Sequence, residues 1–313
     1  MSWNTLLVAV LSGLAWLLPV TIVAAAPMPP AAMAPTQPPL QAKSLLQAKS
    51  PLQAGTTALQ TGDYDLAVRQ LTEALEQAPS SAAYSNRCLA RIYLADYPGA
   101  VTDCTQALQL NPKQPESYLN RGLAYHRLGQ PAEAIADYSQ LLQLKPHDFR
   151  AYYNRGLAQV EQQAYHAAIV DYGEAIRQAT PLDRSALAAI YNDRGLAELW
   201  LEHWPQAIAD FTQAIQFNDR DLRAYYNRGC TYHQQGQLTT ALQDFSQVLQ
   251  IAPNHAQAYL SRGLLQQQLG NSEAALADLQ EAAAYFNQQG AKLAYSQTLQ
   301  LIQKLRVVGM AVG

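Results

Sequence analysis

Residues 151–176 read AYYNRGLAQVEQQAYHAAIVDYGEAI, and this stretch decides the fold. Apolar or small residues recur three and four positions apart, stop at the polar run EQQ, and then resume with the same spacing. Such spacing places the apolar residues on one face of a helix, so the stretch predicts two amphipathic helices joined by a short turn. A pair of this size cannot bury its apolar faces alone, which means that it must pack against similar pairs.

A tripeptide within this stretch recurs along the chain at a fixed period. The arginine spacings between successive tripeptides are 34, 34, 39, 34 and 34. The tripeptides are NRC, NRG, NRG, DRG, NRG and SRG, centred on Arg87, Arg121, Arg155, Arg194, Arg228 and Arg262. A fixed period of this length is typical of stacked helix-turn-helix units. We therefore expect an all-α fold, a right-handed solenoid of about seven helix pairs over residues 48–289.

The residues that follow the repeats predict one more helix. Four apolar residues within 290–313 lie at helical spacing on one side: Leu293, Leu299, Ile302 and Leu305. They predict a C-terminal capping helix that covers the last pair and ends in a short tail. Five extra residues between the fourth and fifth units, Thr180–Arg184, account for the single spacing of 39.

Residues 1–26 differ from the rest of the chain. Leu6–Ala26 carries no charge, and Pro19 ends an apolar run of the length of a signal-peptide core. Cleavage after Ala25 would export the chain to the periplasm or an equivalent compartment. The alternative is an uncleaved membrane anchor, because residues 6–26 as a helix would span roughly 30 Å. Residues 27–47 are rich in Pro, Ala and Gln and predict an extended linker.

Charge and cysteine content limit the partners and the cross-links. With a formal net charge of -3, the chain has no basic field that would attract nucleic acid. Its three cysteines allow at most one disulfide. Cys88 and Cys104 fall in the two helices of one unit, where an oxidising compartment would permit a bridge. We expect buried free thiols at both positions, with Cys230 left single.

The arginines of the repeats are accompanied by aspartates. Each unit with the arginine has an aspartate sixteen residues later, as in Arg121 and Asp137, whereas the first unit has Ala54 and Gln70 there. A charge at a packing position needs a partner, because burying it unpaired has a large desolvation cost. We predict a ladder of Arg–Asp bonds, either within one unit or from the Asp of one unit to the Arg of the next. The sequence leaves both arrangements open.

The repeats resemble the tetratricopeptide repeat family over about Ala48–Gln289. Three series of residues carry the resemblance: first-helix aromatics at Tyr84, Tyr118, Tyr152, Tyr191, Tyr225 and Tyr259; small residues at Cys88, Gly122, Gly156, Gly195, Gly229 and Gly263; and second-helix alanines at Ala67, Ala100, Ala134, Ala168, Ala207, Ala241 and Ala275. The arginine departs from the pattern, since the family usually has leucine at that position.

The resemblance implies that partners bind along a concave face lined by the first helices. The residues that map to this groove are Asn86, Asn120, His126, Arg127, Arg150, Tyr153, Asn154, Asp193, Trp200, Arg223, Tyr226, Asn227 and His233. It implies a non-catalytic scaffold that binds a peptide or an extended segment of a partner protein. The alternative function is a membrane-tethered assembly factor that shields a subunit of an envelope or membrane complex. In the alternative structural interpretation, the asparagines satisfy neighbouring groups.

Sequence motifs of enzymes do not occur. The six histidines form no metal-ligand pair at helical spacing, and the glycines form no phosphate-binding loop. No Ser or Cys lies in a recognisable nucleophile motif. We therefore expect no catalytic activity, no cofactor, no metal site and no small-molecule substrate.

Overall fold

The computed structural model describes residues 50–312, and within them it contains fifteen helices and no strand. The predicted signal or anchor segment and the predicted linker, residues 1–47, lie outside the described residues. Among residues 50–312, no helix is both long and apolar enough to cross a membrane. The described chain divides between Ala186 and Leu187 into two compact units, and each is described by itself.

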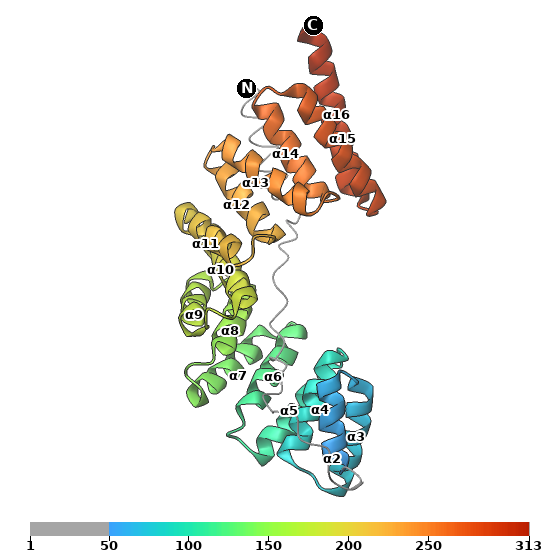
Figure 1. The fold of residues 1–313 in the computed structure, drawn as a ribbon, viewed down its shortest axis with the longest axis vertical. Helices are drawn as coiled ribbons and strands as arrows, with labels where there is room; N and C mark the ends of the chain where they lie inside the picture. The colour runs from blue at the N-terminus through green and yellow to red at the C-terminus, as the bar shows by residue number, and fades with distance from the viewer. Residues whose placement is uncertain (1–49, 313) are drawn as a thin grey trace, which may run out of the picture. The chain divides into compact units, whose positions relative to one another are not determined.

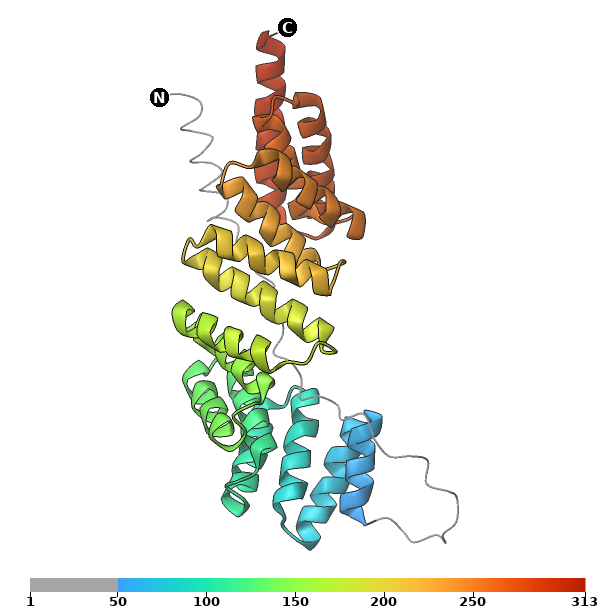
Figure 2. The same cartoon turned by 60° about the vertical axis from the view of Figure 1, so that its left-hand side comes forward.

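The first unit consists of four helix pairs. Its helices are α2 (Pro51–Thr61), α3 (Tyr64–Gln77), α4 (Ser81–Tyr93), α5 (Tyr97–Leu110), α6 (Pro115–Arg127), α7 (Pro131–Leu144), α8 (Phe149–Glu161) and α9 (Tyr165–Gln178). Consecutive helices pack against each other, as the blue and cyan helices show in Figures 1 and 2. The first helices of the pairs, α2, α4, α6 and α8, also contact one another in order and form what we call the first-helix layer.

The second unit holds the remaining pairs and the last helix. Its helices are α10 (Arg184–Trp200), α11 (Trp204–Phe217), α12 (Leu222–Gln234), α13 (Leu238–Ile251), α14 (Ala256–Gln268), α15 (Ser272–Gln288) and α16 (Lys292–Val312). The prediction of seven helix pairs followed by a terminal helix is confirmed. Of the inserted residues, only Arg184 lies in α10, but the insertion lengthens this helix: α10 begins ten residues before Arg194, whereas α6 begins six residues before Arg121.

Small residues allow the two helices of each pair to approach closely. The alanine at the predicted position of each second helix has no exposed surface: Ala67, Ala100, Ala134, Ala168, Ala207, Ala241 and Ala275. In the third pair, Gly122 of α6 lies so close to Tyr138 of α7 that an added Cβ would be 2.7 Å from the ring carbon Cε1. The buried Tyr138 ring fills the space that the glycine leaves. Burial of such a side chain stabilises the pair by about 1.5–3 kcal/mol.

Two expectations from the sequence need correction. Of the predicted stripe on α16, Ile302 is buried against α15 and Leu305 packs there partly buried, whereas Leu293 and Leu299 are 63% and 42% exposed. Ala294, which the prediction left out, is buried in the same cluster as Ala282 and Ala283. The expected free thiols are also wrong, because Cys88 and Cys104 form a disulfide between α4 and α5; the described Cys230 is a free cysteine.

Candidate interaction surface

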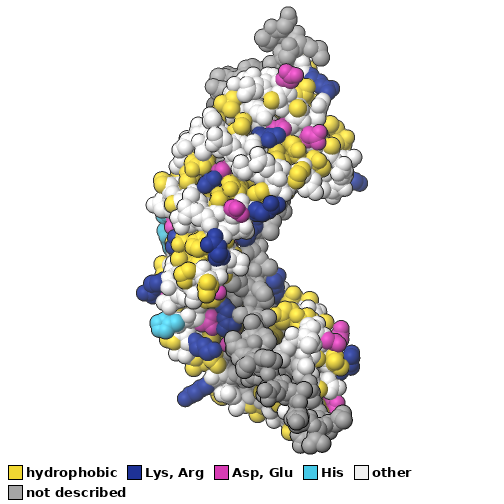
Figure 3. Space-filling model, in the orientation of Figure 1, with side chains coloured by type: hydrophobic (Ala, Val, Ile, Leu, Met, Phe, Trp, Pro, Cys, Tyr) yellow, Lys and Arg dark blue, Asp and Glu magenta, His cyan; other side chains and the backbone are white. Residues whose placement is uncertain are grey.

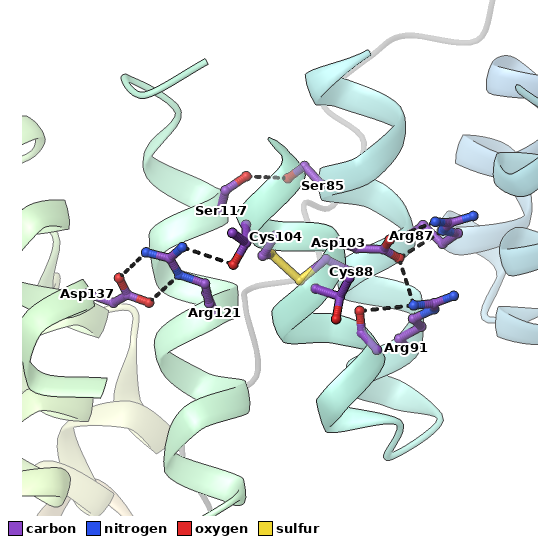
Figure 4. Close-up of a disulfide and its surroundings, with 12 residues drawn as sticks. Ser85, Arg87, Cys88, Arg91, Asp103, Cys104, Ser117, Arg121 and Asp137 are labelled. Carbon is purple, nitrogen blue, oxygen red and sulfur yellow. Dashed lines mark hydrogen bonds and ion pairs between the residues drawn. A yellow bond between two sulfur atoms is a disulfide. The ribbon is translucent and has the colours of Figure 1, made fainter. Parts of the chain in front are cut away.

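Ion pairs hold each first helix to its own second helix. The guanidinium of Arg121 donates from Nε and Nη2 to the two carboxylate oxygens of Asp137, at 2.8 and 2.7 Å (Figure 4). The same pairing joins Arg87 to Asp103, Arg155 to Asp171, Arg194 to Asp210, Arg228 to Asp244 and Arg262 to Asp278. The predicted ladder therefore exists, and its ion pairs run within units.

The contact to the preceding unit is a hydroxyl rather than the predicted aspartate. Arg121 donates from Nη1 to the hydroxyl of Thr105, 3.1 Å away in the second helix of the preceding pair. Four more arginines make the same bond: Arg87 to Thr72, Arg155 to Ser139, Arg228 to Thr212 and Arg262 to Ser246. The hydroxyl always follows the aspartate position by two residues, so the repeat period in the sequence carries the signal for this contact. The fourth pair has Gly173 there and offers no hydroxyl.

The hydrogen bonds outweigh the cost of burying the arginines. Hydrogen bonding to Asp137 raises the pKa of Arg121 above its ordinary value, against the opposing effect of burial. Burial raises the pKa of Asp137, and the hydrogen bonds and charge of the guanidinium oppose this shift. The ring of Tyr118 lies 5.8 Å from the guanidinium carbon and adds a cation–π contact. These contacts orient the first helices and therefore the residues between them.

Polar residues between neighbouring first helices bond to one another in several places. Asn86 of α4 donates from Nδ2 to the hydroxyl of Thr56 in α2, at 3.1 Å. In the second unit, Asn227 donates to Asn192, and Asn192 donates to the carboxylate of Asp193, both at 3.1 Å. At these positions, the asparagines satisfy neighbouring polar groups, as in the alternative structural interpretation of the row.

Asn120 and Asn154 differ from the rest of the row. Asn120 of α6 is 2% exposed and its Oδ1 has no hydrogen-bond partner. Asn154 occupies the same position in α8, has no exposed surface, and has no partner for either Oδ1 or Nδ2. A buried amide group without a partner destabilises the fold by about 1–3 kcal/mol. Two such residues lie in neighbouring first helices, so the part of the first-helix layer formed by α6 and α8 is the candidate site. Because both amides are buried, a ligand reaches them only when the side chains that cover them move aside.

The arginines that we expected in the groove are engaged with carboxylates. Arg150 donates from Nη2 to Asp148 at 2.7 Å and to Glu116 at 3.3 Å, and Glu116 also accepts from Lys145 at 3.0 Å. Arg223 lies 3.5 Å from Asp193 and 3.9 Å from Asp221. On the face visible in Figure 3, Lys and Arg are interspersed with Asp and Glu. Arg150 and Arg223 thus present compensated charges.

The two predicted groove tyrosines pack on aromatic residues of the second helices. Tyr153 has no exposed surface, and its ring centre lies 5.9 Å from that of Tyr172. Tyr226 packs on Phe245, with 5.5 Å between ring centres, and its hydroxyl is 3.3 Å from the hydroxyl of Ser261. The sequence interpretation of Tyr153 as a ligand contact is therefore corrected, because its ring is buried beside Tyr172 of α9. Tyr226 is only partly buried and stays a prediction.

The remaining predicted residues differ in exposure. His126 is buried with Nε2 2.8 Å from Glu161, and burial lowers its pKa although Glu161 opposes the shift. Burial also lowers the pKa of His233, whose Nε2 is 3.3 Å from the amide oxygen of Gln268. Arg127 and Trp200 are exposed, and Trp200 is 45% exposed. Both therefore lie at the surface, in contrast to the two histidines.

Models of one known protein family match most of the repeats. Tetratricopeptide repeat models match residues 52–95, 115–148, 222–255 and 256–288, and a TPR repeat model matches 89–129. The chain belongs to the tetratricopeptide repeat family. Proteins of this family are typically non-catalytic scaffolds that bind protein or peptide partners.

Individual relatives of this tetratricopeptide repeat protein share its fold. Sperm-associated antigen 1 of Rattus norvegicus is 41% identical over 58 residues, which is 18% of this chain and only 6% of that protein. A tetratricopeptide repeat protein from Parabacteroides merdae has a TM-score of 0.56 and 23% identity, over 80% of this chain and 97% of its own. YrrB, described as having an unusual peptide-binding site, has a TM-score of 0.52 and 23% identity, over 63% of this chain and 97% of its own.

Proposed function

We propose that this chain is a non-catalytic scaffold that binds an extended segment of a partner protein on the first-helix layer. The observation that carries the proposal is the pair of buried asparagines with unpartnered amide atoms, Asn120 and Asn154. A peptide backbone offers N–H donors and C=O acceptors, which are the groups that these amides lack. The peptide-binding site described for the similar protein YrrB supports the same use of the fold.

The charges around the site favour an uncharged segment as the ligand. Arg150 of α8 faces two carboxylates, so it offers no uncompensated positive charge to a carboxylate or phosphate. Burying an anion beside already paired arginines would require separating those pairs. We therefore infer recognition through backbone or side-chain amides, with little dependence on salt.

An immobilised array of extended peptides of matched length tests this function. The array contains uncharged, acidic and basic peptides, and the full chain is applied at 50 and 300 mM NaCl. We expect binding to uncharged peptides that changes little with salt. The double substitution Asn120→Ala and Asn154→Ala removes amide hydrogen bonds worth about 0.5–1.5 kcal/mol each, so affinity should fall about tenfold.

Asn86→Ala is the matched control for the array. Asn86 lies in the same row, but its amide already bonds to Thr56. We expect its peptide binding to equal that of the unaltered chain. Unchanged binding by the Asn120 and Asn154 variant would move the site away from these residues. The alternative function, shielding of an apolar subunit surface by a membrane-tethered chain, would leave binding independent of these amides.

We also propose that the chain acts outside the cytoplasm, anchored or released by residues 1–26. The uncharged stretch Leu6–Ala26 and the disulfide support this location, because disulfides persist in oxidising compartments. Cell fractionation followed by mass measurement of the intact chain tests both points. A mass that corresponds to a start after Ala25 would support cleavage, and a full-length chain in the membrane fraction would support the anchor.

A further inference from the structure

The two helices of each pair meet at a seam made by one residue of the first helix and the residue sixteen positions later. Six of the seven described pairs combine a glycine with a bulky apolar residue: Gly55 with Leu71, Gly122 with Tyr138, Gly156 with Tyr172, Gly195 with Phe211, Gly229 with Phe245 and Gly263 with Leu279. At Gly156, an added Cβ would lie 2.6 Å from Cε1 of Tyr172. One large side chain therefore fills the seam, and the opposite residue has none.

In the second pair, two cysteines take the place of the glycine and the bulky residue. Cys88 occupies the glycine position and Cys104 the aromatic position, and they form a disulfide across the seam (Figure 4). Their Cα atoms are 5.5 Å apart, and neither residue has exposed surface. The buried small side chains Ala100 of α5 and Ala124 of α6 pack in one cluster with the two cysteines. Without the bond, neither of the two seam positions holds a large side chain, and only the partly buried Ile92, Tyr97 and Val101 at the edge of the cluster are larger.

We propose that the Cys88–Cys104 disulfide is a folding lock, introduced by thiol–disulfide exchange before α4 and α5 close and required afterwards in place of the glycine–aromatic seam. Closure buries both sulfur-bearing residues completely, so an oxidant cannot reach them in the folded pair. Exchange must therefore precede closure. The reaction that supplies the mature chain belongs to the class of protein dithiol oxidations by a disulfide-bearing oxidant.

The exchange has two steps. The thiolate of one cysteine attacks a sulfur of the oxidant disulfide, which forms a mixed disulfide and releases one oxidant thiolate. The thiolate of the second cysteine then attacks the sulfur of the first, which forms the Cys88–Cys104 bond and releases the second oxidant thiolate. The two cysteine thiols lose two protons and two electrons, and the oxidant disulfide accepts them as two thiols. Cys230 takes no part, and burial raises its pKa to about 12, which keeps it a thiol.

The disulfide lies in the helix pair next to the candidate site. Ser85 of α4 lies one turn before the disulfide and its hydroxyl is 3.1 Å from that of Ser117 in α6, the helix that carries Asn120. Asp103, next to Cys104, binds both Arg87 and Arg91 of α4. Reduction removes the covalent link between α4 and α5 and leaves these polar contacts and the apolar packing around the two thiols to hold the pair. The inference does not depend on what the first-helix layer binds.

Peptide mapping of the full chain tests the bond itself. The chain is purified without reductant, unfolded in the presence of an alkylating reagent, and digested with trypsin. We expect CLAR, residues 88–91, to be linked to the peptide of residues 92–113, with alkylation at Cys230 only. Alkylation of Cys88 and Cys104 in the chain recovered from its native compartment would overturn the proposal.

Thermal unfolding with and without reductant tests the stabilising role. Closing a loop of 16 residues constrains the unfolded chain enough to raise the unfolding temperature by about 5–12 °C, and reduction should lower it by that amount. Cys230→Ser should respond to reductant as the unaltered chain does. The double substitution Cys88→Gly and Cys104→Tyr copies the neighbouring seams and should not respond. An equal response of this variant, or no response of the unaltered chain, would overturn the role of the bond.

The order of the steps is tested by adding oxidant at two times. The unfolded, reduced chain is refolded with oxidised glutathione present from the start, or refolded first and then given the same oxidant. We expect the bond to form at least tenfold more slowly in the second case, because both residues are buried. Equal rates would contradict oxidation before closure.

Discussion

The pair of Arg121 and Asp137 offers the most direct test of how the repeats are held together. Arg121→Ala removes two hydrogen bonds to Asp137 and one to Thr105, and it leaves a carboxylate whose side chain is 5% exposed without its cation. Breaking a fully buried pair costs about 3–5 kcal/mol, and an exposed pair contributes about 0–1 kcal/mol. Because Arg121 itself is 19% exposed, we expect a loss of about 2–3 kcal/mol in the free energy of unfolding.

A double-mutant cycle separates the pair from its surroundings. Asp137→Ala should cost about 1–2 kcal/mol, because Arg121 keeps Thr105 and some water as partners. Urea unfolding of the full chain, followed by circular dichroism, should then give a coupling energy of about 1–2 kcal/mol between the two substitutions. In the control cycle, Arg121→Ala and Asp103→Ala should be additive within about 0.5 kcal/mol, because Asp103 binds Arg87. A coupling energy below about 0.5 kcal/mol between Arg121→Ala and Asp137→Ala would refute a stabilising ion pair between these residues.

Two further predictions concern packing and pH. Gly156→Ala places a Cβ 2.6 Å from Tyr172 and should lower the free energy of unfolding by about 1–3 kcal/mol in urea titrations. Gly129→Ala has nothing within 4 Å and only a positive φ to oppose it, so it should cost about 1 kcal/mol, and equal losses would contradict the close seam. Burial lowers the pKa values of His126, His233 and His255, so the unfolded chain binds more protons than the folded chain below the unfolded pKa of about 6.5. Thermal scans should therefore show stability falling between pH 7 and 5, and His126→Gln should weaken this dependence; an unchanged dependence would remove His126 from the explanation.

The candidate site shows where sequence reasoning stops. The repeat period correctly places Asn120 and Asn154 at equivalent positions of neighbouring first helices. It cannot tell them from Asn86, whose partner Thr56 lies thirty residues earlier in another helix. Whether a buried amide is satisfied depends on which side chain happens to face it across the layer. That information is in the packing of helices and not in their spacing along the chain.

The sequence by itself determined the number of helix pairs and their order. It also limited the partner of each arginine to the aspartate of its own unit or that of the preceding unit. It could do so because helical periodicity fixes which residues share a face, and because a repeat of fixed period forces neighbours to stack. Only the tertiary structure decided that each arginine binds its own aspartate and that most also bind the hydroxyl of the preceding pair, that Tyr153 is buried, and that Arg150 is neutralised by Glu116. It also decided that Cys88 and Cys104 are joined. Each of these depends on the distance between two helices, and a one-dimensional pattern carries no distance across an interface.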